Sequence, residues 1–221
     1  VLPVPEIRNI VPSEGPWFGG TLVRVLVNNL PPNGRFECVF GTATAPATVM
    51  DPVSGLLSCP SPPSKQNISS YVPVTVNYVQ SSLVVIGGSN TSFHYLQYPN
   101  VFGVQNSFGP TSGGTNVHFF GEFEVDVDVY CHFIPDGAAD AGEITMATVV
   151  SSNEVICYSA PLNLSTELVR HVPMYLSYNG ADILDTGFVF EYYVTPVITG
   201  MSVTSGPQTG GVSVTLYVSR L

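Results

Sequence analysis

The sequence predicts an all-β protein made of tandem antiparallel β-sandwiches. Short runs rich in valine, threonine, tyrosine and phenylalanine are separated by 21 glycines and 19 prolines. Runs such as residues 72–78 alternate their side chains with the period of two expected of a half-buried strand. No stretch of about ten or more residues without Gly or Pro shows apolar side chains at helical spacing, so we expect no helix.

One block of sequence occurs three times, so the chain is expected to be an array of similar units. The copies begin at Pro5, Pro99 and Pro196, which are 94 and 97 residues apart. Each copy carries a Gly-Pro pair and a Gly-Gly pair at the same offsets. These pairs are Gly15-Pro16 and Gly19-Gly20, Gly109-Pro110 and Gly113-Gly114, and Gly206-Pro207 and Gly210-Gly211. A period near 100 residues is the size of a domain with its own core.

The later part of each repeat agrees as well, since residues 71–78 resemble residues 171–178. We therefore predict a first module over residues 1–97 (module one) and a second over residues 98–195 (module two). Residues 196–221 are expected to be the first strands of an incomplete third module. The connections, residues 96–98 and 193–195, are short and leave little hinge freedom. With no initial Met, the chain is expected to be a piece of a longer protein.

The glycine pairs lie between strand-like runs, for example between residues 7–11 and 21–27. This position predicts a turn that needs positive φ angles. A phosphate-binding loop is the alternative, and it is disfavoured because no helix follows to offer its N-terminus.

The four cysteines divide equally between the modules, and each lies in a strand-like apolar segment. They are Cys38 and Cys59 in module one, and Cys131 and Cys157 in module two. The even count and the equal division favour one disulfide within each module. A zinc site would need four ligands at short spacing, which the sequence lacks.

Three Asn-x-Ser/Thr triplets are candidate N-glycosylation sites, at Asn67, Asn90 and Asn163. Asn67 and Asn163 occupy corresponding polar loops, each between the second cysteine and the repeated Val-Pro strand. Disulfides and N-glycans together predict passage through the secretory pathway and an extracellular or cell-surface location.

The repeated motifs resemble those of the IPT/TIG domain family over essentially the whole chain. The motifs are Gly-Pro-x-x-Gly-Gly-Thr at residues 15–21, Cys-x-Phe at residues 38–40 and 131–133, and Phe-x-Tyr at residues 93–95 and 190–192. The resemblance implies tandem immunoglobulin-like sandwiches of the E-set type. Members of the family occur in plexin-like receptor ectodomains, surface proteins, Rel-type transcription factors and carbohydrate-active enzymes, so the fold alone does not define a function.

Two departures from the expected patterns concern loops and a tryptophan. Module two has Ile134-Pro-Asp where module one has Gly41, which affects the local loop but not the fold. No Trp lies between either pair of cysteines, unlike in antibody domains. The only Trp, Trp17, is expected to be partly buried at the end of module one, with an exposed contact role as the alternative.

The charge balance disfavours a nucleic-acid partner. Six basic residues against 16 acidic ones give a formal net charge of −10, and the basic residues form no cluster. A protein that binds DNA needs a basic surface to neutralise phosphates. The mean hydropathy of +0.28 predicts a surface that sugars or neighbouring subunits cover in part.

An acidic row alternates with apolar residues within module two, at Glu122, Glu124, Asp126 and Asp128. If the segment is extended, the four carboxylates share one face. The row would then be a cation site or a docking face for a basic partner. The alternative is a solvated edge strand whose charges prevent unwanted pairing.

We expect no enzymatic activity and no cofactor. The four histidines are scattered, and the sequence has no nucleophile elbow, His-Glu-x-x-His pair or phosphate-binding loop.

These observations lead to one hypothesis and two alternatives. The hypothesis is a structural or adhesive extracellular array that contacts other protein chains, copies of itself or glycans, within a larger surface or filament protein. The alternatives are the stalk of a plexin-like receptor and an accessory module of a secreted carbohydrate-active enzyme. Any membrane attachment is expected to come from segments outside this sequence.

Overall fold

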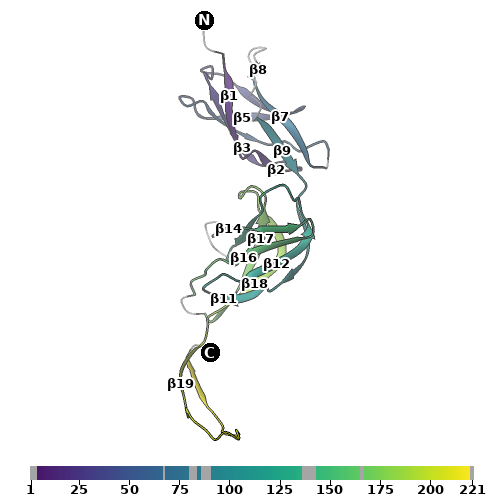
Figure 1. Ribbon diagram of the computed structural model, residues 1–221. Helices are drawn as coiled ribbons and strands as arrows, with labels where there is room; N and C mark the ends of the chain where they lie inside the picture. Colours follow the sequence, from purple (N-terminus) through teal and green to yellow (C-terminus); the bar gives the residue numbers. More distant parts are fainter. Residues whose placement is uncertain are drawn as a thin grey trace.

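The computed structural model describes residues 4–66, 68–79, 84–85, 91–135, 143–164 and 167–219. Within these residues all regular elements are strands, which confirms the all-β prediction. Figure 1 shows three groups of strands that follow one another along the molecule from the N-terminus to the C-terminus.

The strands fall into the following groups. Module one contains β1 (Glu6–Val11), β2 (Glu14–Pro16), β3 (Leu22–Asn28), β4 (Phe36–Phe40), β5 (Ala43–Asp51), β6 (Leu56–Pro60), β7 (Ser70–Tyr78), β8 (Val84–Val85) and β9 (Ser92–Leu96). Module two contains β10 (Asn100–Gln105), β11 (Phe108–Pro110), β12 (Asn116–Glu122), β13 (Tyr130–Phe133), β14 (Ile144–Met146), β15 (Thr148–Ser151), β16 (Glu154–Tyr158), β17 (Val169–Ser177) and β18 (Leu184–Tyr193). The last group is the hairpin of β19 (Val197–Met201) and β20 (Leu216–Ser219).

Each module is a sandwich of two layers whose strands are antiparallel, except that β2 pairs in parallel with β9 and β11 with β18. In module two the layers are separate sheets, with strand orders β10-β12-β16-β15 and β11-β18-β17-β13-β14. In module one the single long strand β5 pairs with β4 through residues 43–47 and with β6 through residues 48–51, so it connects the two layers. Module two divides the same path into β14 and β15, with Ala147 between them.

Alternation of side chains along the strands builds a separate core in each module. On β3, Val23, Val25 and Val27 are buried, while Leu22 before them and Arg24 between the first two face solvent. This is the pattern of a strand with one face on a core and one in water. The two cores form distinct clusters, with Val25 and Phe93 in the first and Phe119 and Phe190 in the second.

A disulfide joins the two layers of each sandwich. Cys38 on β4 is bonded to Cys59 on β6, and Cys131 on β13 is bonded to Cys157 on β16. The Cα–Cα distances are 6.2 and 6.0 Å, and all four side chains are buried. The structure thus contains the two pairs that the cysteine count favoured.

The glycine pairs have two different roles. Gly19 and Gly20 have φ angles of 80° and 98°, which agrees with the predicted turn. Gly15, however, lies in the short strand β2, which pairs in parallel with β9, so the Gly-Pro pair is not part of the turn. A Cβ atom on Gly15 would overlap the Thr21 hydroxyl, which explains the need for glycine there.

The interpretation of the acidic row as an extended segment is wrong. Strand β12 ends at Glu122, and the chain bends over residues 125–127 before β13 begins. The partner strands β10 and β16 pair with β12 no further than Glu122 and Phe120, so the segment that follows has no neighbouring strand to extend it. The carboxylates of Glu122, Glu124, Asp126 and Asp128 therefore do not line one face of a strand.

The C-terminal hairpin repeats the β1–β3 hairpin without its core. Ile198 and Leu216 are 61% and 48% exposed, whereas Ile7 and Val25 at the corresponding positions of module one are 2% and 0% exposed. An isolated two-stranded hairpin is marginally stable in water. We propose that residues 196–219 begin a third module, after modules with limits near residues 1–97 and 98–195.

Removing one disulfide tests whether the two sandwiches unfold as separate units. We predict that Cys131→Ala with Cys157→Ala lowers the free energy of unfolding of module two by about 3 kcal/mol, because the denatured chain regains the freedom of the closed loop. Differential scanning calorimetry measures the loss. The fluorescence of Trp17, which packs against the core of module one, reports on module one separately.

The matched control is Cys38→Ala with Cys59→Ala, which moves the Trp17 transition instead. Equal shifts of the Trp17 transition in both variants would contradict the division into two independent cores.

Candidate functional site

The candidate functional site is the polar junction between the two modules, where three residues, 97–99, connect β9 to β10. Leu96 belongs to both sides, since its carbonyl accepts a hydrogen bond from the Trp17 amide at 2.9 Å and its side chain packs in the core of module two. Leu96 is the last residue of β9. Its backbone hydrogen bond to module one and its buried side chain in module two therefore fix the direction in which the chain passes from one module to the next.

A loop of module two, residues 178–183 between β17 and β18, reaches the end of module one. Asn179 starts the turn, and its Oδ1 accepts hydrogen bonds from the amides of Ala181 at 3.0 Å and Asp182 at 2.8 Å. Gly180 takes a φ of 72°, and its amide donates to Ser177 Oγ at 3.1 Å. These local bonds hold the loop in one shape before it contacts module one.

Two polar side chains of this loop bind module one directly. The buried Thr21 hydroxyl donates to Asp182 Oδ2 at 2.5 Å, and Asn179 Nδ2 donates to the Glu14 carbonyl at 2.9 Å. Asn179 Nδ2 also lies 2.7 Å from Asp182 Oδ2. Asp182 is thus held by a donor from each module, as a half-buried carboxylate requires.

Aromatic rings line the same junction. The Tyr98 hydroxyl donates to the Asp182 carbonyl, and its ring lies 5.3 Å from the ring of Phe18 and 6.1 Å from that of Tyr178. Burial, with the nearby Asp182 second, raises the pKa of Tyr98 well above its usual value, so its hydroxyl remains a donor. Burial raises the pKa of Tyr178 to about 12.

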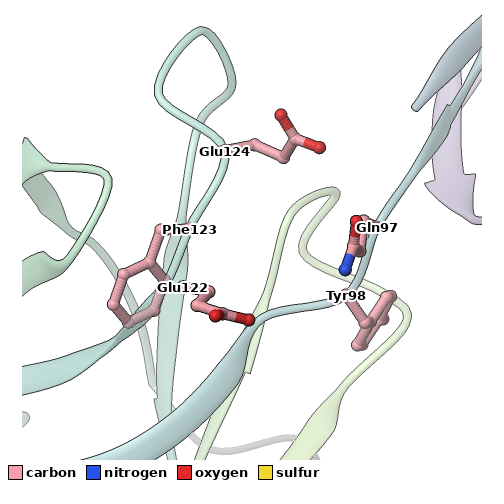
Figure 2. A pocket seen from close by; sticks show the side chains of 5 residues that line it. All are labelled: Gln97, Tyr98, Glu122, Phe123 and Glu124. Atoms are coloured by element: carbon pink, nitrogen blue, oxygen red, sulfur yellow. The ribbon is translucent and has the colours of Figure 1, made fainter. Parts of the chain in front are cut away.

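A further contact lies beside a small cavity at the junction. The Ser69 hydroxyl of module one donates to Glu124 Oε1, and the Glu124 amide donates to the Tyr178 hydroxyl at 3.0 Å. The cavity measures about 250 Å³. Figure 2 shows Gln97 and Tyr98 on one side of this cavity and Phe123 and Glu124 on the other.

Two titratable groups of module one near the junction have shifted pKa values, and burial is the main cause of both shifts. Burial, and then the charge of Asp128, raises the pKa of Glu14. Burial lowers the pKa of His94, while the charge of Glu124 opposes that shift. Among the described residues, no group of three or more His, Cys, Asp or Glu side chains could hold a metal ion.

The histidines occupy structural positions. His118 Nδ1 lies 2.7 Å from Glu154 Oε1, and His94 stacks on Tyr71 with ring centroids 3.8 Å apart. His132 is fully buried, with Nε2 2.8 Å from Ser177 Oγ. These side chains lie on different strands and are not brought together.

The predicted glycosylation sites have different positions in the structure. Asn163 is exposed in the loop that follows β16, where a glycan could be attached without disturbing a core. Asn67 and Asn90 lie outside the described residues. All three remain predictions.

Sequence reasoning missed the residues that join the modules, above all Thr21, Asn179 and Asp182. The Asn179-Gly180 pair is a turn signal that could have identified the loop. It could not have identified the partner, because Thr21 and Asp182 are 161 residues apart in the chain.

Comparison with known families assigns the first module. Residues 5–95 match the IPT/TIG domain. Module one is an IPT/TIG domain. Module two shares sequence motifs with module one and is also a two-layer sandwich. The two modules therefore have the same kind of fold.

Similar solved structures have low sequence identity to this chain. The full extracellular region of plexin A4 is 18% identical, with a TM-score of 0.56 over 92% of this chain and 18% of that chain. This chain therefore spans about a fifth of the plexin region. SGBP-B of the Bacteroides ovatus mixed-linkage glucan utilization locus, solved in complex with a mixed-linkage heptasaccharide, is 11% identical, and the match covers 86% of this chain and 48% of that chain with a TM-score of 0.30.

Removing the Asp182 carboxylate tests the junction. We predict that Asp182→Ala weakens the coupling between the modules by about 1–3 kcal/mol, because the buried Thr21 hydroxyl and the Asn179 amide lose their acceptor. Small-angle X-ray scattering should show a broader range of inter-module angles. The control is Asp185→Ala, which removes an exposed carboxylate that bonds only locally, to the Gly187 amide. An unchanged scattering curve for Asp182→Ala would show that this carboxylate does not fix the angle.

Protonation of Glu14 at low pH should stabilise the folded state at the junction. A raised folded-state pKa means that its stabilising contribution is present below the ordinary pKa of 4.5 and is lost as the pH rises through the raised value. We predict that Glu14→Gln is more stable than the parent chain at about pH 7 and that the difference shrinks towards about pH 4. Urea unfolding followed by Trp17 fluorescence measures it. The exposed Glu6→Gln is the control, and a pH-independent difference for Glu14→Gln would contradict the assignment.

Proposed function

We propose that this chain is part of a non-enzymatic extracellular array whose IPT/TIG modules make structural or adhesive contacts with other protein chains, copies of itself or glycans. The observation that carries the proposal is the fixed junction. Thr21, Asn179 and Asp182 join the modules by hydrogen bonds across a connection of three residues, so the array can hold its outer faces in a set arrangement.

The remaining features support the same proposal. A disulfide in each module suits an oxidising compartment. The IPT/TIG fold is typically a binding or structural module rather than a catalytic one. Apart from these two supporting features, the part of the chain that the structure describes contains no helix that could span a membrane.

A receptor stalk is the second candidate. The similarity of fold to the plexin A4 extracellular region favours it, because a stiff pair of modules could equally hold a separate ligand-binding domain away from a membrane. In that case the outer faces of the modules need not contact copies of the same chain.

Electron microscopy combined with light scattering on the intact glycoprotein from its native source distinguishes the two candidates. The structural proposal predicts ordered polymers or fibres. Dispersed monomers or dimers would overturn it and favour the receptor stalk. Enzymatic removal of N-glycans before imaging shows whether the contacts depend on sugars.

A further inference from the structure

A groove of about 620 Å³ lies beside the junction, between the outer face of one layer of module one and the 178–183 loop of module two. Several apolar side chains of its lining are exposed: Leu22 is 66%, Met50 60% and Val11 52% exposed. Leu56 on β6 extends this apolar surface. Aliphatic side chains that remain this exposed on a sheet face are typical of a contact surface.

One cation lies among these aliphatic side chains. Arg24 lines the groove from β3, where its neighbours across the sheet are Val11 on β1 and Ser58 on β6. Among the described residues, no hydrogen bond or ion pair engages its side chain. A guanidinium group is weakly hydrated and matches a carboxylate with two parallel hydrogen bonds. The groove therefore suits an occupant with a carboxylate beside aliphatic side chains.

The lining favours a protein segment over a sugar. A sugar ring presents several hydroxyl groups, and each would lose its hydrogen bonds to water against Leu22, Met50 and Leu56. Among the residues that the structure describes, no aromatic ring lines the groove to offer a stacking surface.

The chain itself carries a segment of the required chemistry. The loop at residues 124–128 reads Glu-Val-Asp-Val-Asp, in which Val125 is 53% exposed and Asp126 and Asp128 face solvent. Its bend over residues 125–127 presents these side chains outside the sheet. The loop is not part of the lining of its own groove.

We propose that the 124–128 loop of one copy docks in the Arg24 groove of a second copy. Val125 packs against Leu22 and Met50, and the Asp126 carboxylate pairs with the Arg24 guanidinium. Donor loop and acceptor groove are different surfaces, so each copy keeps one of each free, and the contact is head-to-tail. This inference rests on the proposed structural role and names the surfaces that would perform it.

Charge reversal on the 221-residue chain tests the contact. Sedimentation velocity over a concentration series measures self-association of the parent chain, Arg24→Glu and Asp126→Arg. Each single reversal should weaken association by about tenfold or more, because it places like charges together. The double variant carrying both reversals should recover it, and so should an equimolar mixture of the two single variants.

Matched controls separate this contact from general effects of charge and of the exposed C-terminal hairpin. Arg8→Glu and Glu167→Arg make the same charge changes at exposed residues that neither line the groove nor lie in the loop. Ile198→Ser reduces the apolar surface of β19. All three should leave the association unchanged, and Trp17 fluorescence with circular dichroism verifies that each variant is folded.

Three results would overturn the inference: a parent chain that stays monomeric at high concentration, single reversals without effect, or a double variant that does not recover. If the chain fails to associate while the intact glycoprotein forms ordered polymers, the groove contact is wrong and the structural role stands. If neither associates, both are wrong.

Discussion

The carboxylate of Asp182 is the constraint on which the two-module arrangement depends. A half-buried carboxylate is costly unless donors surround it, and its two donors come from different modules: the Thr21 hydroxyl and the Asn179 amide. The bond to Thr21 can form only when the modules adopt one relative position. Without both donors, burial of the Asp182 carboxylate would destabilise the junction. The cost of desolvating this carboxylate therefore favours the one relative position of the modules in which both hydrogen bonds form.

The fold could be predicted well from the sequence because its causes are local and repeated. Alternation along β3, glycine pairs at fixed offsets and two cysteines per period each reflect a requirement that recurs in both sandwiches. Val23 and Val25 are buried because the strand has one face on the core, and Gly19 takes a positive φ because the turn demands it. Such requirements place the same types of residue at corresponding positions of each copy.

The junction could not be predicted, since its causes are neither local nor repeated. Module one has Val79 and residues 80–82 where module two has the Asn179–Asp182 turn, so comparison of the repeats gives no signal there. Extrapolating alternation also failed at residues 122–128. The pattern of charged and apolar residues is that of a strand, but the strands that pair with β12 extend no further than Glu122 and Phe120, and Val125 is 53% exposed. Local alternation cannot show where the partner strands end, because pairing is a long-range contact.

The same junction links the shape of the array to what it can bind. The groove around Arg24 takes its lining from β1, β3, β5 and β6 of module one and from Asn179 and Ala181 of module two. An occupant that touches both parts loses contacts whenever the modules tilt, so part of its binding free energy depends on the angle that Asp182 fixes. By linkage, an occupant that binds the docked arrangement must also stabilise it. The hydrogen bond between Thr21 and Asp182 thus influences the affinity of the Arg24 groove, although neither side chain lines that groove.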